Sequence, residues 1–208
     1  MTLVDTDGKG VDRLTGDSVV VGDQSYPVDI IIFATGYLAP PSGTPAEKGN
    51  LTITGRNEMS MSEDWAHDGP KTLHGVLDHR FPNLFLSGPG QASVAGNFLF
   101  SVDTLAKHSA YILAEAKHRA GRKPFAVVPT TAAIDDWGTK LMMRSLPMAA
   151  MMGCTPGYMN LEGSLDKAAP EEQLKMARGG LWGHGIEDFL KHVEAWRAEG
   201  KMEGIDIS

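Results

Sequence analysis

The stretch at residues 82–100 joins a short apolar run to a glycine-rich segment and then to a helical pattern. The apolar run at residues 84–86 ends at the sequence Ser-Gly-Pro-Gly, residues 87–90. Glycines at such a junction allow positive φ angles and let a flat or anionic ligand approach the main chain. A helix start adds unpaired N–H groups and the positive end of its dipole. The stretch therefore predicts either an ordinary strand-to-helix turn or a loop that binds an anionic ligand.

A second apolar run, at residues 30–34, ends in a similar way. Asp29 precedes it, and the sequence Thr-Gly-Tyr at residues 35–37 follows it. The run is too short for a helix and rich in β-branched side chains, which predicts a strand covered on both faces, as in parallel sheets. Ligands of open α/β sheets gather at the carboxyl ends of such strands. The two glycine-ended runs together favour an α/β fold with a ligand at the strand ends.

Several other segments are expected to be short strands. Residues 18–21 and 25–28 flank a glycine-bearing loop, which predicts a hairpin. Residues 1–5 also have a strand-like sequence with no lead-in, so we expect this strand to lie at an edge or to pair with segments encoded upstream. Further short strands are predicted at residues 51–54, 72–76, 125–128 and 204–207.

Apolar residues at three-and-four spacing predict three amphipathic helices, at residues 98–119, 130–145 and 186–199. Thr130 or Thr131 would cap the second helix, and Pro170 suits the start of a further helix. The methionine-rich segment at residues 141–152 is expected to be flexible core filler, although methionines also line adaptable ligand pockets.

Composition restricts the possible partners. The 208-residue chain has a net charge of −7 and no dense basic run, so a nucleic-acid partner is not expected. No apolar stretch has the length of a membrane span. The single cysteine, Cys154, suggests a reducing compartment and a structural role. His74 and His79 lack acidic or thiol companions at ligand spacing, so core-capping or solvated roles are expected and no metal site. The sequence thus predicts a cytoplasmic protein.

Two motifs carry a resemblance to a known family. Residues 28–37, Val-Asp-Ile-Ile-Ile-Phe-Ala-Thr-Gly-Tyr, resemble the D-x-x-x-x-A-T-G-[YF] segment of flavin-containing and Baeyer–Villiger monooxygenases. Residues 81–90 resemble the F-P-N-L-F-x-x-G-P-G segment of Baeyer–Villiger enzymes of the phenylacetone monooxygenase kind. Gly55, Met61 and Trp65 resemble a further element between the two motifs, and the last helix and strand are similar to the family's C-terminus. The resemblance is strongest over residues 28–118 and looser after residue 125.

The resemblance implies an α/β fold that is part of a two-dinucleotide-binding, three-layer fold, incomplete at its N-terminus. Residues 1–37 would form the end of the NADP-binding domain and its return strand. Residues 38–124 would form the C-terminal part of the FAD-binding domain, and residues 125–208 a helical extension on the substrate and cofactor side. The implied cofactors are FAD and NADPH, and the implied co-substrate is O2. Through a peroxyflavin, the complete enzyme would insert oxygen beside a ketone carbonyl or oxygenate a heteroatom.

The same resemblance implies which residues touch the cofactors. One group would pack near flavin or cofactor where the chain passes between domains, and a second would lie beside the isoalloxazine ring. The residues expected to bind cofactor are Thr35, Gly36 and Tyr37 in the first group, and Gly88, Pro89, Gly90, Gln91 and Ser93 in the second. N–H groups and a helix dipole at the second group would stabilise negative charge on a flavin.

Departures from the family pattern suggest an incomplete enzyme. The sequence has no G-x-G-x-x-G motif. The family's F-x-G-x-x-x-H-x-x-x-W-[PD] fingerprint and its peroxyflavin-binding arginine are also absent, so these and the catalytic residues are expected upstream of Met1. Residues 154–160 replace an aromatic-containing loop, which leaves the substrate open.

These features give one leading hypothesis and two rivals. The chain would be the C-terminal part of a Baeyer–Villiger-type monooxygenase, either a truncated reading frame or one half of a split enzyme with a separate N-terminal half as partner. The rivals are a flavin monooxygenase acting on nitrogen or sulfur, and a non-catalytic remnant or structural partner.

Overall fold

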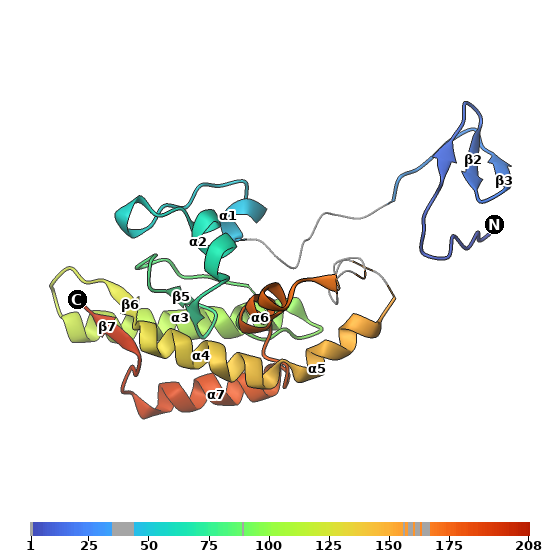
Figure 1. Ribbon diagram of the computed structural model, residues 1–208. Helices are drawn as coiled ribbons and strands as arrows, with labels where there is room; N and C mark the ends of the chain where they lie inside the picture. Colours follow the sequence, from blue (N-terminus) through green and yellow to red (C-terminus); the bar gives the residue numbers. More distant parts are fainter. Residues whose placement is uncertain are drawn as a thin grey trace.

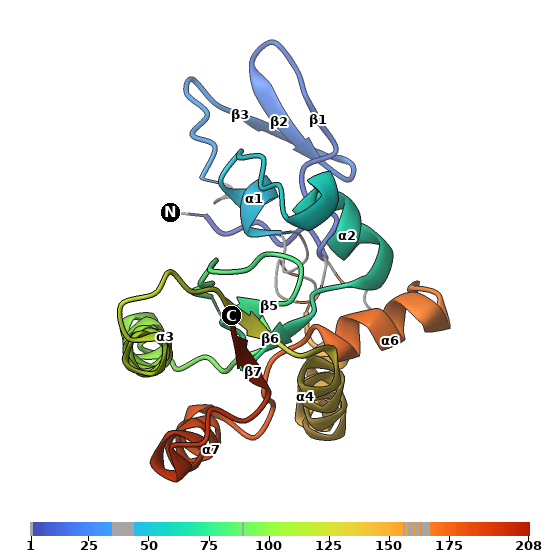
Figure 2. The same ribbon diagram turned by 90° about the vertical axis from the view of Figure 1, so that its left-hand side faces the viewer.

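A computed structural model describes residues 2–34, 44–88, 90–155, 157, 160, 163 and 167–208. Its larger part is built around three long helices, α3 (Phe98–Ala120), α4 (Thr131–Arg144) and α7 (Ile186–Glu199). The three helices run side by side along short strands, and Figure 2 shows them nearly end-on around these strands. The helices confirm the three predicted amphipathic segments, with bounds that differ by one residue or less.

The N-terminal segment forms a small antiparallel sheet of β1 (Arg13–Leu14), β2 (Ser18–Val21) and β3 (Gln24–Pro27). The predicted hairpin is therefore confirmed, with a tight turn at Gly22, whose φ is +58°. Residues 2–5 form no strand, contrary to expectation. This sheet stands apart from the helical part in Figure 1.

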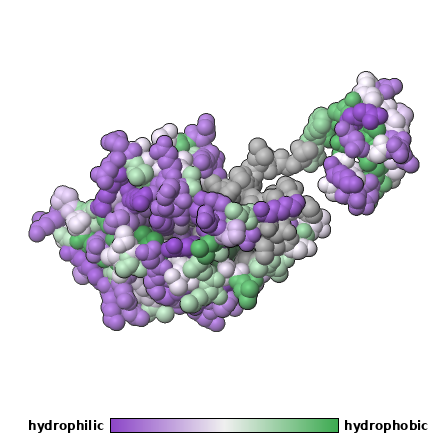
Figure 3. Space-filling view, viewed as in Figure 1, coloured by the Kyte–Doolittle hydropathy of each residue, from purple (hydrophilic) through white to green (hydrophobic). Residues whose placement is uncertain are grey.

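The apolar run after this sheet does not form the predicted buried strand. Residues 28–34 have no strand structure, and the exposed fractions of Ile30, Ile32 and Phe33 are 79%, 85% and 73%. A strand needs neighbours that satisfy its backbone and cover its faces. Within the described residues no strand runs beside this segment. Figure 3 shows the resulting hydrophobic surface next to the small sheet.

The described residues between β3 and α3 form short helices and short strands joined by irregular segments. It contains α1 (Pro45–Lys48), the 3-10 turn η1 (Arg56–Glu58), α2 (Met61–Asp68), β4 (Thr72–Leu73) and β5 (Leu77–Asp78). The strand predicted at residues 51–54 is reduced to one bridge between Thr54 and Ser60, and the apolar run at residues 84–86 to one between Leu77 and Phe85. These two short apolar runs thus form single β-bridges in place of full strands, because no long partner strand lies beside them among the described residues.

Local caps fix the ends of the helices. Asn97 accepts a hydrogen bond from the Leu99 N–H at the start of α3, and Thr130 accepts one from Ala133 at the start of α4. The remaining elements are β6 (Val127–Pro129), α5 (Leu146–Ala149), the 3-10 turn η2 (Ala150–Gly153), α6 (Pro170–Arg178) and β7 (Ile205–Ile207). Strands β6 and β7 pair antiparallel, so the C-terminal Ser208 lies beside Ala126, just before the start of β6.

The main core lies between the long helices and the β4–β5 pair. Trp137 of α4 stacks on Trp182 with ring centroids 4.9 Å apart, and Phe189 of α7 packs edge-on against both. All three side chains are fully buried, and large aromatic rings bury much apolar area. This core supports the segment that follows residue 86.

Candidate functional site

The glycine-rich loop at residues 87–93 has an outer side that is open. Ser87 and Gly90 are exposed, and Gly88 is half-buried. A Cβ placed on Gly88 or on Gly90 would meet no described atom within 4 Å, apart from atoms of its chain neighbours. This part of the backbone is therefore open enough for a ligand to lie directly against it.

The inner side of the loop is buried and held by hydrogen bonds. Gln91 is 1% exposed and has a φ of +55°. Its side-chain oxygen accepts hydrogen bonds from the hydroxyl (2.6 Å) and the backbone N–H of Thr72, and its amide nitrogen donates to the carbonyl of Arg178 at 3.0 Å. Its backbone N–H donates to Gly180, and its carbonyl accepts from Trp137 Nε1 at 2.9 Å. Gln91 thus joins the loop to β4, α4 and the end of α6.

The next residues continue this attachment. The Trp182 N–H donates to the carbonyl of Ala92 at 2.7 Å, and the Ser93 hydroxyl donates to the Trp182 carbonyl at 3.4 Å. Ser93 is 2% exposed. The side chains of Gln91 and Ser93 therefore face the protein interior, whereas Gly88 and Gly90 face outward.

The turn between β4 and β5 packs tightly under the loop. Gly75 has a φ of +76°, and a Cβ there would lie 2.7 Å from the Ala92 Cβ and 3.1 Å from the Gly90 carbonyl oxygen. Only glycine allows this approach without displacement of the loop.

The first turn of α3, which follows the loop in sequence, is also exposed. Phe98, Leu99 and Phe100 have exposed fractions of 51%, 76% and 42%, and the turn contains no acidic residue. Helix N-termini attract negative charge, and the apolar side chains suit a flat or apolar neighbour. We use the term outer surface for the exposed backbone at Gly88 and Gly90 together with the exposed residues 98–100.

Some predicted site residues lie outside the described residues. These are Thr35, Gly36, Tyr37 and Pro89. Residues 156, 158 and 159 of the segment at residues 154–160 also lie outside them. Cys154 of this segment is exposed, with its Sγ 3.6 Å from the Ala150 carbonyl oxygen. The cofactor role of the eight residues and the three domain boundaries stay predictions.

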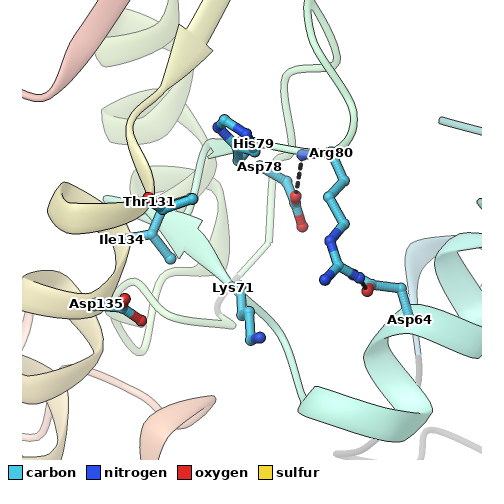
Figure 4. A pocket seen from close by; sticks show the side chains of 8 residues that line it. All are labelled: Asp64, Lys71, Asp78, His79, Arg80, Thr131, Ile134 and Asp135. Carbon is cyan, nitrogen blue, oxygen red and sulfur yellow. Dashed lines mark hydrogen bonds and ion pairs between the residues drawn. The ribbon is translucent and has the colours of Figure 1, made fainter. Parts of the chain in front are cut away.

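A cavity of about 110 Å³ lies between α2, β5 and α4, and charged side chains line it (Figure 4). Arg80 forms an ion pair with the buried Asp64, and its backbone N–H donates to Asp78. Burial raises the pKa of Asp78, whose other oxygen accepts from Trp65 Nε1 at 3.0 Å. The lining includes none of the predicted cofactor residues, and its charges largely compensate one another.

A cluster of three histidines, two buried and one half-buried, was not predicted. His74 Nδ1 lies 3.0 Å from His108 Nε2, and the His74 ring contacts His192 at 5.9 Å between centroids. Burial lowers the pKa of all three histidines, and that of His108 to about 3. Only the expectation that His74 caps the core pointed toward this cluster, because its members are distant in sequence. Among the described residues no group of side chains suits a metal ion.

Comparison with known proteins shows which of them this chain resembles in sequence and in fold. The FAD-binding monooxygenase ausC of Aspergillus calidoustus is 40% identical over 210 residues, 99% of this chain and 31% of that protein. The polycyclic ketone monooxygenase of Thermothelomyces thermophilus is 38% identical over 99% of this chain and 32% of that protein. Its solved structure superposes with a TM-score of 0.87. This chain is thus similar, over about a third of their length, to FAD-binding monooxygenases, one of which is a polycyclic ketone monooxygenase.

The match confirms the recognised resemblance and the α/β fold class. A steroid monooxygenase solved with NADP has the same fold over 99% of this chain and 34% of its own, with a TM-score of 0.70 at 22% identity. The chain spans about a third of the length of the relatives it matches. No protein-family model matches it. No helix among the described residues is long and apolar enough to cross a membrane.

Proposed function

We propose that this chain supplies one wall of the flavin site of an FAD- and NADPH-dependent monooxygenase that inserts one oxygen atom of O2 into a ketone. The observation that carries the proposal is the outer surface, where the backbone at Gly88 and Gly90 is open and the start of α3 is free of acidic residues. Relatives named as FAD-binding and polycyclic ketone monooxygenases support it.

The residues present fit a flavin. An isoalloxazine ring is flat, and Gly88 and Gly90 leave room for a flat group against the main chain. Phe98 and Leu99 follow the loop closely in sequence, and their apolar side chains are exposed. When bound, FAD would supply the chemistry of electron transfer and O2 activation.

The role of this chain's own residues would be binding and electrostatics. Backbone N–H groups of the loop and the dipole of α3 would stabilise negative charge on the bound flavin. The apolar wall would exclude water from the same space. Phosphate binding would fall to the upstream part, because this chain has no G-x-G-x-x-G motif.

The upstream part of the protein would also cover the exposed apolar residues. Ile30, Ile32 and Phe33 are more than 70% exposed, although their sequence is that of a buried strand. A strand of the upstream part would pair with residues 28–34 and bury them. The partner would be joined to this chain or form a separate N-terminal half.

A hybrid protein tests the proposal. In this hybrid, the present chain replaces the matching third of the T. thermophilus polycyclic ketone monooxygenase. We expect the hybrid to retain FAD through gel filtration, to oxidise NADPH faster when a polycyclic ketone is added, and to form the ester. The first two-thirds of the relative alone serve as the control and should do none of these.

Three other results would each contradict the proposal. An N- or S-oxide formed in place of the ester would support the heteroatom monooxygenase. A hybrid that melts cooperatively but holds no FAD would support a structural remnant. Tight FAD binding and ketone-dependent NADPH oxidation by the 208-residue chain alone would also overturn the proposal, because its site would then be complete.

A further inference from the structure

Gln91 stands out among the predicted cofactor residues because its side chain cannot reach a ligand. It is 1% exposed, and both acceptor positions of its amide oxygen are used by Thr72. Its amide nitrogen donates to Arg178. A buried amide whose oxygen and nitrogen are both hydrogen-bonded to the protein in this way serves structure and not ligand contact.

The backbone at Gln91 is in a conformation that usually favours glycine. Its φ is +55°, a region that costs free energy for a residue with a long side chain. The hydrogen bonds of the Gln91 side chain offset this backbone cost, so the side chain selects the conformation of the loop at this point.

The groups that bind Gln91 come from parts of the chain that are distant in sequence. Thr72 belongs to β4, Trp137 to α4, and Arg178 and Gly180 to the end of α6. Trp182, two residues after Gly180, continues the same attachment by bonding to Ala92 and Ser93. The loop is thus fixed from inside by three separate elements, and its outer side is left free.

We propose that Gln91 is a positioning residue: through Thr72 and Arg178 it holds the loop at residues 87–93 in the shape in which Gly88 and Gly90 face the flavin. The proposal rests on the proposed function for the identity of the ligand. The effect of Gln91 on the cofactor is indirect and passes through the backbone of the loop.

The first experiment uses the 208-residue chain without cofactor. Gln91→Met keeps the length of the side chain and removes all its hydrogen bonds, and Gln24→Met on the exposed strand β3 is the matched control. We expect the NMR order parameters of the Gly88 and Gly90 amides to fall from about 0.85 toward 0.6 in Gln91→Met and to stay unchanged in the control. Unchanged order parameters in a folded Gln91→Met protein would overturn the proposal.

A second pair of variants covers the case in which Gln91→Met does not fold. Thr72→Val removes the hydroxyl that donates to Gln91, and Thr72→Ser keeps it. We expect lower order parameters at Gly88 and Gly90 in Thr72→Val and a return to the wild-type values in Thr72→Ser. Equal values in both variants would contradict the proposal.

The hybrid then tests the link to the flavin. We expect Gln91→Met to weaken FAD binding about tenfold and to shift the flavin reduction potential to a more negative value, because N–H groups that stabilise the reduced flavin would be misplaced. A changed melting temperature with unchanged affinity and potential would show a merely structural role and overturn the proposal. If the unsubstituted hybrid binds no FAD, the proposed function fails, whereas the order parameters still decide whether Gln91 positions the loop.

Discussion

At the scale of the residue, burial determines the behaviour of the histidine cluster. His74 from the β4–β5 turn meets His108 from α3 and His192 from α7, and Lys140 and Arg197 lie close enough to disfavour a further positive charge. Sequence spacing could not reveal this cluster, because its members are 34 and 84 residues from one another. Gln91 was singled out from its motif, but its burial depends on Thr72 and Arg178, which no local pattern connects to it.

This burial predicts a dependence of stability on pH. Burial lowers the pKa of His108 from 6.5 to about 3 and also lowers the pKa of His74. As the pH falls below about 6.5, the unfolded chain takes up protons before the folded chain does. Stability present above that pH is therefore lost toward about pH 3, by at most about 1.4 kcal/mol per pH unit for each histidine.

Thermal melting of His108→Gln between about pH 7.5 and about pH 5 checks this prediction. We expect its melting temperature to fall less over this range than that of the unsubstituted chain. His118→Gln, at an exposed position of the same helix, should follow the unsubstituted chain. Equal slopes for His108→Gln and the unsubstituted chain would show that His108 is not the titrating group.

At the scale of the element, local signals predicted helices better than strands. The periods and caps of α3, α4 and α7 lie within each segment, so the sequence was sufficient to locate them. Strand formation depends on a partner elsewhere in the chain, and the runs at residues 28–34, 51–54 and 84–86 found no long partner among the described residues. The glycine loop was recognised because its signature is local, whereas its attachment to residues 178–182 is not.

The close approach of the β4–β5 turn to the loop gives a prediction at this scale. Gly75→Ala places a Cβ against Ala92 and Gly90, and Gly121→Ala places one in open space at a similar positive φ of +66°. We expect Gly121→Ala to lower the free energy of unfolding by about 1 kcal/mol and Gly75→Ala by a further 1–3 kcal/mol or so, since only the latter overpacks the loop. Urea denaturation of both variants measures the difference, and equal costs would refute the close packing.

At the scale of the whole molecule, the exposed apolar run at residues 28–34 is the segment that we expect a neighbouring strand to cover. Residues 28–34 carry the composition of a buried parallel strand but lie exposed. The chain matches only about a third of the length of its relatives, and we propose that strands of the remaining two-thirds cover this run.

Hydrogen exchange tests this interpretation. We expect the backbone amides of Ile30, Ile32 and Phe33 to exchange rapidly in the isolated chain and slowly in the hybrid, where a neighbouring strand would satisfy them. Ser18–Val21, which is already paired in β2, should be protected in both proteins. Rapid exchange of residues 30–33 in a folded hybrid would show that this run remains unpaired.

The FAD content of the hybrid after gel filtration tests the central claim most directly. Gly88→Val places a branched side chain in the open space on the outer surface, where an added Cβ meets no described atom within 4 Å apart from its chain neighbours. The proposed function predicts that the unsubstituted hybrid retains close to one FAD per molecule and that Gly88→Val loses most of it, while both melt at similar temperatures without cofactor. Full retention of FAD by the Gly88→Val hybrid would contradict a flavin-facing loop.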